Sequence, residues 1–143
     1  MINIRLGEIN DAEKLYELCL LFNNSETATT EENIKHYLKD NQEMVWIAED
    51  DGKLIGFITG CIESNLSFGT PIGTISEVFV RSEYRKKGIA TQLFKQIEKV
   101  FLEKGVYRFR VMTTANNTKA ANFYGGLNYQ SLEMIMFRKD LVK

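Results

Sequence analysis

The chain has 143 residues, of which 44% are hydrophobic and 26% charged, and its formal net charge at pH 7 is −1. A chain of this length can bury a sizeable core, so we expect one domain over residues 1–143. The balanced composition argues against a disordered chain, a fibre or a general nucleic-acid binder. No apolar run reaches the ~20 residues of a membrane span, and the first residues lack a signal-peptide pattern. We therefore expect a cytoplasmic protein without membrane or nucleic-acid partners.

The N-terminal part of the chain predicts one strand and two helices. Alternating apolar residues over 2–6 indicate the strand. Asn10 or Asp11 can cap the first helix, whose apolar stripe runs to Phe22. After a polar break from Asn23 to Thr30, a second helix is predicted to begin.

Three side chains with reactive chemistry are expected to be structural. Cys19 and Cys61 lie in apolar periodic segments and not at paired spacings, which indicates reduced thiols. His36, the only histidine, lies on the second predicted helix beside Tyr37, and a solvent-facing role is expected for it.

The middle of the chain predicts a hairpin. Residues 44–48 and 54–63 have the composition of strands, and the segment Asp50 to Lys53 between them is a strong turn signal. Gly56 and Gly60 interrupt the second strand, which predicts a bulge or a close backbone contact there.

The stretch from Ile75 to Thr91 organises the rest of the chain. It begins as a strand whose alternation predicts two faces, one with Ile75, Glu77 and Phe79 and the other with Ser76, Val78 and Val80.

A basic turn follows this strand and opens a helix predicted over residues 89–104. Free amides and the dipole at a helix start attract phosphate groups, and Gly88 lets a ligand approach the backbone closely. Arg85, Lys86 and Lys87 add positive charge. The turn alone is equally compatible with a solvated basic loop.

The C-terminal part predicts a strand over residues 106–113 and a short helix, 119–124, capped by Asn117. Two final strands are predicted over 129–132 and 134–138. Antiparallel hairpins come first, and a crossover helix joins the central strands. We therefore expect an α/β (α+β mixed) fold with a mixed sheet of about seven strands flanked by four helices.

Two motifs lie on these elements. Arg85 to Ala90 matches the pattern Arg/Gln-x-x-Gly-x-Gly/Ala. Residues 117–124 match Asn-x-x-Ala-x-x-Phe-Tyr through Asn117, Ala120, Phe123 and Tyr124. With these motifs and this element order, the chain resembles the GCN5-related N-acetyltransferase (GNAT) family, which transfers an acetyl group from acetyl-CoA to an amine.

The resemblance implies that acetyl-CoA is the acetyl donor, that no metal is needed, and that the partner is an amine-bearing substrate. Amides from Lys86 to Thr91 would hold the pyrophosphate, and the backbone of residues 78–80 would pair with the pantetheine arm. The implied cofactor-binding residues are Val78, Phe79, Val80, Arg85, Lys86, Lys87, Gly88, Ile89, Ala90, Thr91 and Asn117.

Two catalytic residues are expected. Glu77 lies mid-strand beside the implied thioester site, and an isolated carboxylate is hard to explain as sheet packing. It would take the proton of the amine, although it can instead pair with a cation or bind the substrate ammonium without catalysing. Tyr124 would give a proton to the departing CoA thiolate, although helix spacing alone fits a core aromatic beside Phe123.

Three departures from the family pattern stand out. Ala90 replaces the commoner second glycine. Gly125–Gly126 replaces a charged pair, which predicts a short or mobile helix end. Asn128 replaces a glycine, and asparagine tolerates the left-handed conformation that such a turn needs.

The acceptor is expected to be a small molecule such as an aminosugar, an aminoglycoside-like compound or a polyamine. Four acidic residues favour such a cationic substrate but fit a solvated surface equally well: Glu26, Glu31, Glu32 and Glu63. The alternatives are a protein or peptide N-acetyltransferase and a non-catalytic CoA-binding regulatory domain. A homodimer is a further expectation, because the apolar run Met134 to Phe137 can pair across an edge.

Overall fold

The computed structural model describes residues 1–23 and 29–142, so most of the predicted polar break between Asn23 and Thr30 lies outside the described residues. The chain forms two compact units, residues 1–112 and 113–143, and each is described by itself. The extent of one domain over residues 1–143 therefore stays a prediction.

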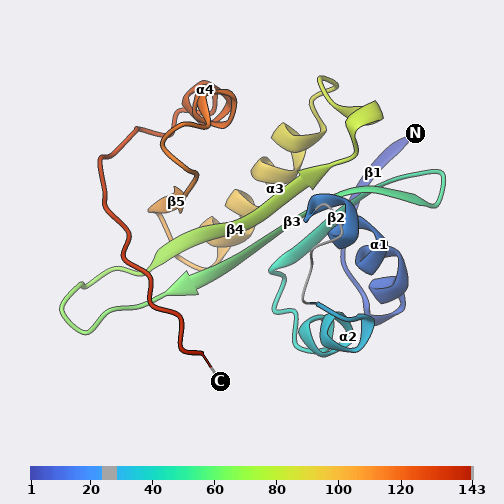
Figure 1. Ribbon diagram of the computed structural model, residues 1–143, viewed down its shortest axis with the longest axis horizontal. Helices are drawn as coiled ribbons and strands as arrows, with labels where there is room; N and C mark the ends of the chain where they lie inside the picture. Colours follow the sequence, from blue (N-terminus) through green and yellow to red (C-terminus); the bar gives the residue numbers. More distant parts are fainter. Residues whose placement is uncertain (24–28, 143) are drawn as a thin grey trace. The chain divides into compact units, whose positions relative to one another are not determined.

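The first unit holds a sheet and three α-helices (Figure 1). Its strands are β1 (Ile2–Leu6), β2 (Val45–Asp50), β3 (Lys53–Glu63), β4 (Ile72–Val80) and β5 (Phe109–Val111). Its helices are α1 (Ala12–Phe22), α2 (Glu31–Lys39) and α3 (Ile89–Glu103). The second unit holds α4 (Thr118–Gly126).

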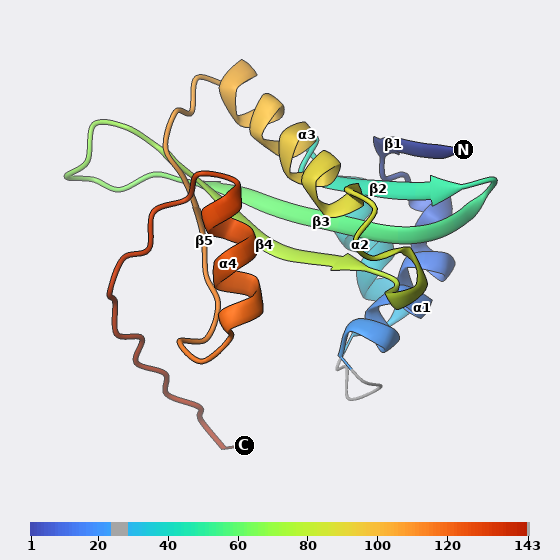
Figure 2. The same cartoon turned by 90° about the horizontal axis from the view of Figure 1, so that it is seen from above.

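The described strands form one sheet in the order β1-β2-β3-β4-β5. Neighbours run antiparallel except β4 and β5, which are parallel and connected by α3. Helix α3 covers one face of this sheet, whereas α1 and α2 cover the other (Figures 1 and 2). The predicted mixed α/β architecture is confirmed.

The described sheet has five strands where about seven were predicted. Residues 129–132 and 134–138 form no strand, so the prediction of two final strands is wrong in this structure. Apolar side chains such as Ile135 and Phe137 are 82% and 90% exposed. Apolar alternation favours an extended backbone, but a strand also requires a partner edge, and this segment has no ladder partner among the described residues. No helix in the described part of the chain is long and apolar enough to span a membrane.

The predicted β2–β3 hairpin is confirmed. Asp51 and Gly52 both have positive φ, 48° and 85°. This is the backbone geometry that matches the twist of two paired strands in a tight turn, and Asp-Gly is a residue pair that adopts it readily.

Asp11 stabilises the start of α1 through hydrogen bonds to residues that precede the helix, and not by capping the helix with its side chain. Its carboxylate accepts the Glu8 amide at 2.8 Å and the Arg5 guanidinium at 2.8 and 2.9 Å. Burial alone would raise the pKa of Asp11, but these hydrogen bonds outweigh it, so the pKa lies below its usual value. The carboxylate therefore ties β1 to the helical turn before α1.

Two glycines let α3 pack closely on the sheet. A Cβ atom at Gly73 would lie 2.7 to 2.8 Å from ring carbons of Phe101, and one at Gly60 would lie 2.7 Å from Ile97. Phe101 and Ile97 are fully buried. The predicted close contact at Gly60 is therefore confirmed. The short distance between α3 and the sheet depends on having glycine, which carries no side chain, at both positions.

Gly73→Ala is expected to lower the free energy of unfolding by about 1–3 kcal/mol, because the new methyl group overpacks the core against Phe101. Urea unfolding measures the change. Gly69→Ala is the matched control, since a Cβ there meets no atom within 4 Å and φ is not positive. Equal midpoints for the two variants would show that α3 does not pack through this contact.

Candidate active site

An extra residue in β4 determines on which face of the sheet Glu77, the candidate base, lies. Thr59 of β3 pairs with Glu77, whereas the next residue, Gly60, pairs with Ile75. Ser76 is therefore unpaired in the ladder, which is a β-bulge.

The bulge corrects the predicted faces of β4. Ile75 lies opposite Gly60 on the α3 side and is 2% exposed. Glu77 lies opposite Thr59 on the α1 side, so it does not share a face with Ile75. Simple alternation fails here because the bulge adds one residue to the period of two.

Glu77 lies at an inner cavity of about 160 Å³ between α1, α2 and the sheet. The Thr59 hydroxyl donates to its carboxylate at 3.4 Å. Among residues 1–23 and 29–112, no cation forms an ion pair with Glu77, and its side chain is exposed. The alternative of a cation-paired structural carboxylate is thus not supported within this unit, and a charged group is left to face the cavity.

Cys19 of α1 lines the same cavity. Burial, and secondarily the charge of Glu77, raise the pKa of this thiol, so it stays protonated at neutral pH. Both Cys19 and Cys61 are free and partly buried, as predicted. Neither Cys19 nor Thr59 is among the site residues expected from the sequence, although a hydroxyl in the apolar run of β3 is a usable signal for Thr59.

The edge of β4 beside the bulge is open. Strand β5 pairs only with residues 73–75 of β4, although β4 continues to Val80. Within the described part of the first unit, no strand pairs with Val78 or Phe79 on the β5 side. Their backbone groups on this side are available to an extended ligand.

The basic turn between β4 and α3 has the backbone that its sequence predicts. Gly88 has φ 79° and is the N-cap of α3, without a capping side chain. Lys86 also has positive φ, at 63°. The first amides of α3, from Ile89 to Thr91, precede the first helical hydrogen bond, which Gln92 donates to the Gly88 carbonyl.

Two side chains brace this turn. The Arg85 Nε donates to the Val80 carbonyl at 3.0 Å, and its guanidinium lies 5.8 Å from the centre of the Phe79 ring. The Lys87 ammonium lies 5.2 Å from the centre of the Tyr84 ring. Arg85 therefore stabilises the connection from β4 to α3, whereas sequence analysis assigned it only to the cofactor.

The second unit contains Tyr124 and Asn117. The Asn117 side chain accepts the Ala120 amide at 3.1 Å, which confirms it as a helix N-cap. Burial raises the pKa of Tyr124, so its phenol is protonated at neutral pH. Its ring centre lies 5.9 Å from that of Phe123 and 6.5 Å from that of Tyr129.

The end of α4 differs from the prediction. The helix continues through Gly125 and Gly126 and does not stop at Tyr124. Asn128 has φ 70°, so the predicted left-handed turn is confirmed. The pairing of Tyr124 with Glu77 belongs to the proposed mechanism, because these residues lie in different units.

Of the four acidic residues expected to favour a cationic substrate, those that the structure describes lie in different structural environments. Glu63 forms an ion pair with Arg110, and the Thr74 hydroxyl donates to the Glu63 carboxylate at 3.3 Å. Glu31 and Glu32 lie in the first turn of α2, where they complement the helix dipole. Glu26 lies outside the described residues.

Comparison with known proteins identifies the family. The model of the acetyltransferase (GNAT) family matches residues 9–129. An acetyltransferase from Yersinia pestis (strain Pestoides F) is 25% identical over 144 residues, which covers 99% of this chain and 96% of the relative. A thialysine N-epsilon-acetyltransferase from Mus musculus is 36% identical over 58 residues, or 41% of this chain and 34% of the relative.

Two solved structures show the same fold. One is the aminoglycoside acetyltransferase AAC(6')-Iy with the bisubstrate analog CoA-S-monomethyl-acetylneamine, at TM-score 0.83 and 20% identity over 99% of each chain. The other is a ribosomal-protein-alanine N-acetyltransferase from Brucella melitensis biovar Abortus 2308, at TM-score 0.80 and 18% identity over 98% of this chain and 100% of that one. The family match over most of the chain shows that this protein belongs to the acetyltransferase (GNAT) family and is an N-acetyltransferase.

Proposed function

We propose that the protein uses acetyl-CoA to acetylate a primary amine of a small polar molecule, with Glu77 as the base and Tyr124 as the acid. The observation that carries this proposal is the setting of Glu77. The bulge at Ser76 turns its carboxylate into a cavity, no cation of the first unit's described residues neutralises it, and the open edge of β4 begins beside it. A substrate ammonium fits such a carboxylate.

The residues of the first unit fit CoA. The open backbone from Val78 to Val80 suits the amide-rich pantetheine arm, which would lie along β4 as an added strand. The uncapped amides from Ile89 to Thr91 suit the pyrophosphate, and the exposed Lys86 and Lys87 add charge beside them. Gly88 leaves open space, since a Cβ there meets no atom within 4 Å. Asn117 is the remaining proposed contact, from the second unit.

Acetyl-CoA supplies an acetyl thioester. The amine nitrogen forms a bond to the carbonyl carbon of this thioester, and the carbon–sulfur bond breaks. Glu77 holds the ammonium and takes the proton that the nitrogen must lose, directly or through water. A backbone amide between Val78 and Val80 polarises the thioester carbonyl, a contribution of a few kcal/mol in sites of this kind.

Tyr124 gives the proton that the departing sulfur needs. The raised pKa of its phenol keeps that proton in place at neutral pH. The family motif and the helix that begins at Asn117 support this role.

For the acceptor, we propose an aminosugar, an aminoglycoside-like compound or a polyamine. The similar fold of aminoglycoside acetyltransferases and the compact cavity at Glu77 support a small molecule. The similar fold of a ribosomal-protein-alanine N-acetyltransferase keeps a protein or peptide acceptor as the alternative. The cytoplasmic location and the homodimer stay predictions.

The first test measures thiol release from acetyl-CoA over a panel of aminosugars, polyamines and a peptide with an N-terminal alanine. Release is expected with at least one small amine. Glu77→Gln is expected to lower kcat roughly 10²-fold or more and to remove the acidic limb of the pH–rate profile. Glu103→Gln, a surface carboxylate on α3, is the control. An unchanged acidic limb in Glu77→Gln would remove Glu77 as the base, and release only with the peptide would favour the alternative.

Gly88→Val is expected to weaken CoA binding at least about ten-fold, because the side chain crowds the proposed pyrophosphate turn. Isothermal titration of CoA measures the Kd. Gly105→Val is the matched control, since Gly105 also has positive φ (77°) and no atom within 4 Å of a Cβ. Both variants carry similar backbone strain, so equal Kd values would contradict pyrophosphate binding at Gly88.

Tyr124→Phe is expected to lower kcat roughly 10²-fold with little change in the Kd for acetyl-CoA, because only the proton donor is lost. Tyr129→Phe removes a phenolic hydroxyl in the same unit and serves as the control. Full turnover in Tyr124→Phe would exclude Tyr124 from proton transfer.

A further inference from the structure

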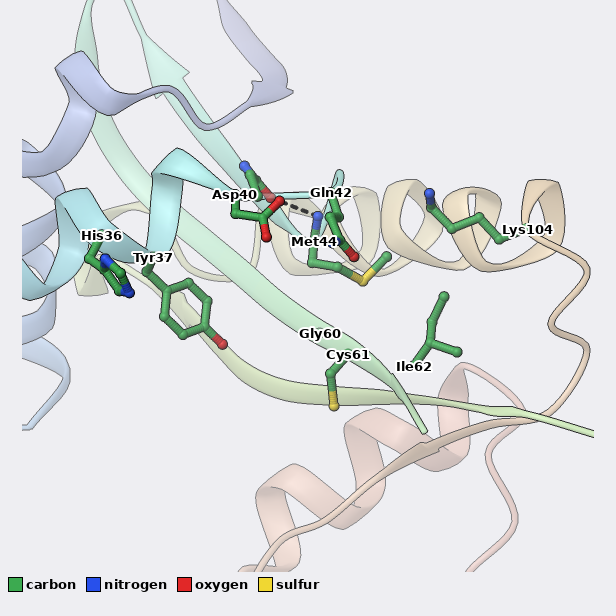
Figure 3. Close-up of a pocket in the computed structure, with 10 residues that line it drawn as sticks. His36, Tyr37, Asp40, Gln42, Met44, Gly60, Cys61, Ile62 and Lys104 are labelled. Carbon is green, nitrogen blue, oxygen red and sulfur yellow. Dashed lines mark hydrogen bonds between the residues drawn. The ribbon is translucent and has the colours of Figure 1, made fainter. Parts of the chain in front are cut away.

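A second, larger cavity of about 400 Å³ lies beside the first (Figure 3). It is bounded by His36 and Tyr37 of α2, the connection from α2 to β2, Cys61 of β3, and Lys104 at the end of α3. The role of this outer cavity is not explained by the acetyl-transfer residues described above.

The wall formed by residues 40–44 is held in an unusual backbone conformation. Gln42 and Glu43 have consecutive positive φ values of 51° and 64°. The Asn41 side chain supports them, because it accepts the Met44 and Val45 amides at 2.7 Å each and donates to the Gly7 carbonyl at 3.0 Å. The wall is therefore a built part of the first unit and not a loosely attached loop.

The inner and outer cavities are neighbouring compartments of one site. Tyr37 lines both of them. Thr59 lines the inner cavity and Cys61 the outer one. Because these are alternate residues of β3, they lie about 7 Å apart along the strand. The Tyr37 ring extends from α2 toward the sheet (Figure 3), and it belongs to the wall of both cavities.

The inner compartment is too small for a whole aminosugar or polyamine. Its volume of about 160 Å³ is below the roughly 300–1,000 Å³ of typical ligand cavities. It suits only the amine-bearing end that Glu77 receives. The rest of an acceptor must extend beyond it, and the compartment past Tyr37 offers the larger space.

The lining of the outer compartment indicates what it receives. Tyr37 is 56% exposed, and Asp40 and His36 are exposed on the same side of α2. A carboxylate and an aromatic ring in one lining suit a second ammonium group through charge and cation–π attraction. Lys104, a cation of the same lining, lies at the other end of the cavity, away from Asp40 and Tyr37 (Figure 3). Gln42 adds an amide that can bond a hydroxyl group.

We propose that the outer compartment selects acceptors with a second amino group, and that Tyr37 and Asp40 are the specificity-determining residues. This inference rests on the proposed function, since the first amino group is the one placed at Glu77. An acceptor with two amino groups then places one in each compartment, whereas a monoamine has no second ammonium group to place in the outer one.

The test compares matched acceptors, neamine against glucosamine and spermidine against butylamine. Each pair contrasts a molecule with several separated amino groups and one with a single amino group. The imidazole proton signals of His36, the only histidine, report binding in the outer compartment. The extended amine of at least one pair is expected to shift these signals and to have a KM at least ten-fold below that of its short partner.

Two variants test the residues directly. Asp40→Asn is expected to raise KM for the extended acceptor about ten-fold without changing kcat and to leave the short acceptor unaffected. Tyr37→Ala is expected to abolish the KM preference for the extended acceptor over the short one, whereas Tyr37→Phe retains the ring and the preference. Asp51→Asn, an exposed carboxylate in the β2–β3 turn, is the control.

The outcomes separate this inference from the proposed function. Acetylation with an unmoved His36 signal, or equal effects of the variants on long and short amines, would overturn the inference and leave the acetyltransferase intact. Absence of thiol release with every amine would refute the proposed function and the inference with it.

Discussion

The single extra residue at Ser76 determines which side chains of β4 pack against α3 and which face the cavity on the other side of the sheet. Before the bulge, Gly73 and Ile75 face α3, and the buried face of this helix packs directly on the backbone there. After it, Glu77 turns to the opposite face and meets Thr59. Without the bulge, strict alternation would place the carboxylate in the apolar interface with α3, where an unpaired charge costs several kcal/mol.

The same strand supplies an open edge because β5 is short. Pairing with β5 stops at Ile75, so within the described part of the first unit Val78 and Phe79 have no strand partner on that side. Arg85 closes the far end of this edge through the Val80 carbonyl and leads into the turn at Gly88. Strand, turn and helix start therefore form one continuous surface of backbone donors and acceptors, which suits a long amide- and phosphate-bearing ligand.

The proposed acceptor side is built differently, from side chains on separate elements. The inner cavity uses α1, α2, β3 and β4, whereas the outer one adds the rigid connection held by Asn41. Under the proposed function, variation in α2 and this connection would change the acceptor without disturbing β4.

Local chemistry allowed much of this to be predicted from the sequence: the turn at Asp51–Gly52, the αL N-cap at Gly88 and the cap at Asn117 each depend on a few neighbouring residues. The family motif likewise pointed to Tyr124, and the mid-strand place of a carboxylate pointed to Glu77; the catalytic roles of both stay predictions. Only the tertiary structure decided which face Glu77 takes, because that depends on register between strands. It also decided that Cys19 and Thr59 line the same cavity as Glu77, because a cavity is formed by residues distant in sequence. The described chain after residue 128 forms no strand, because a strand needs a partner edge that the local sequence does not supply.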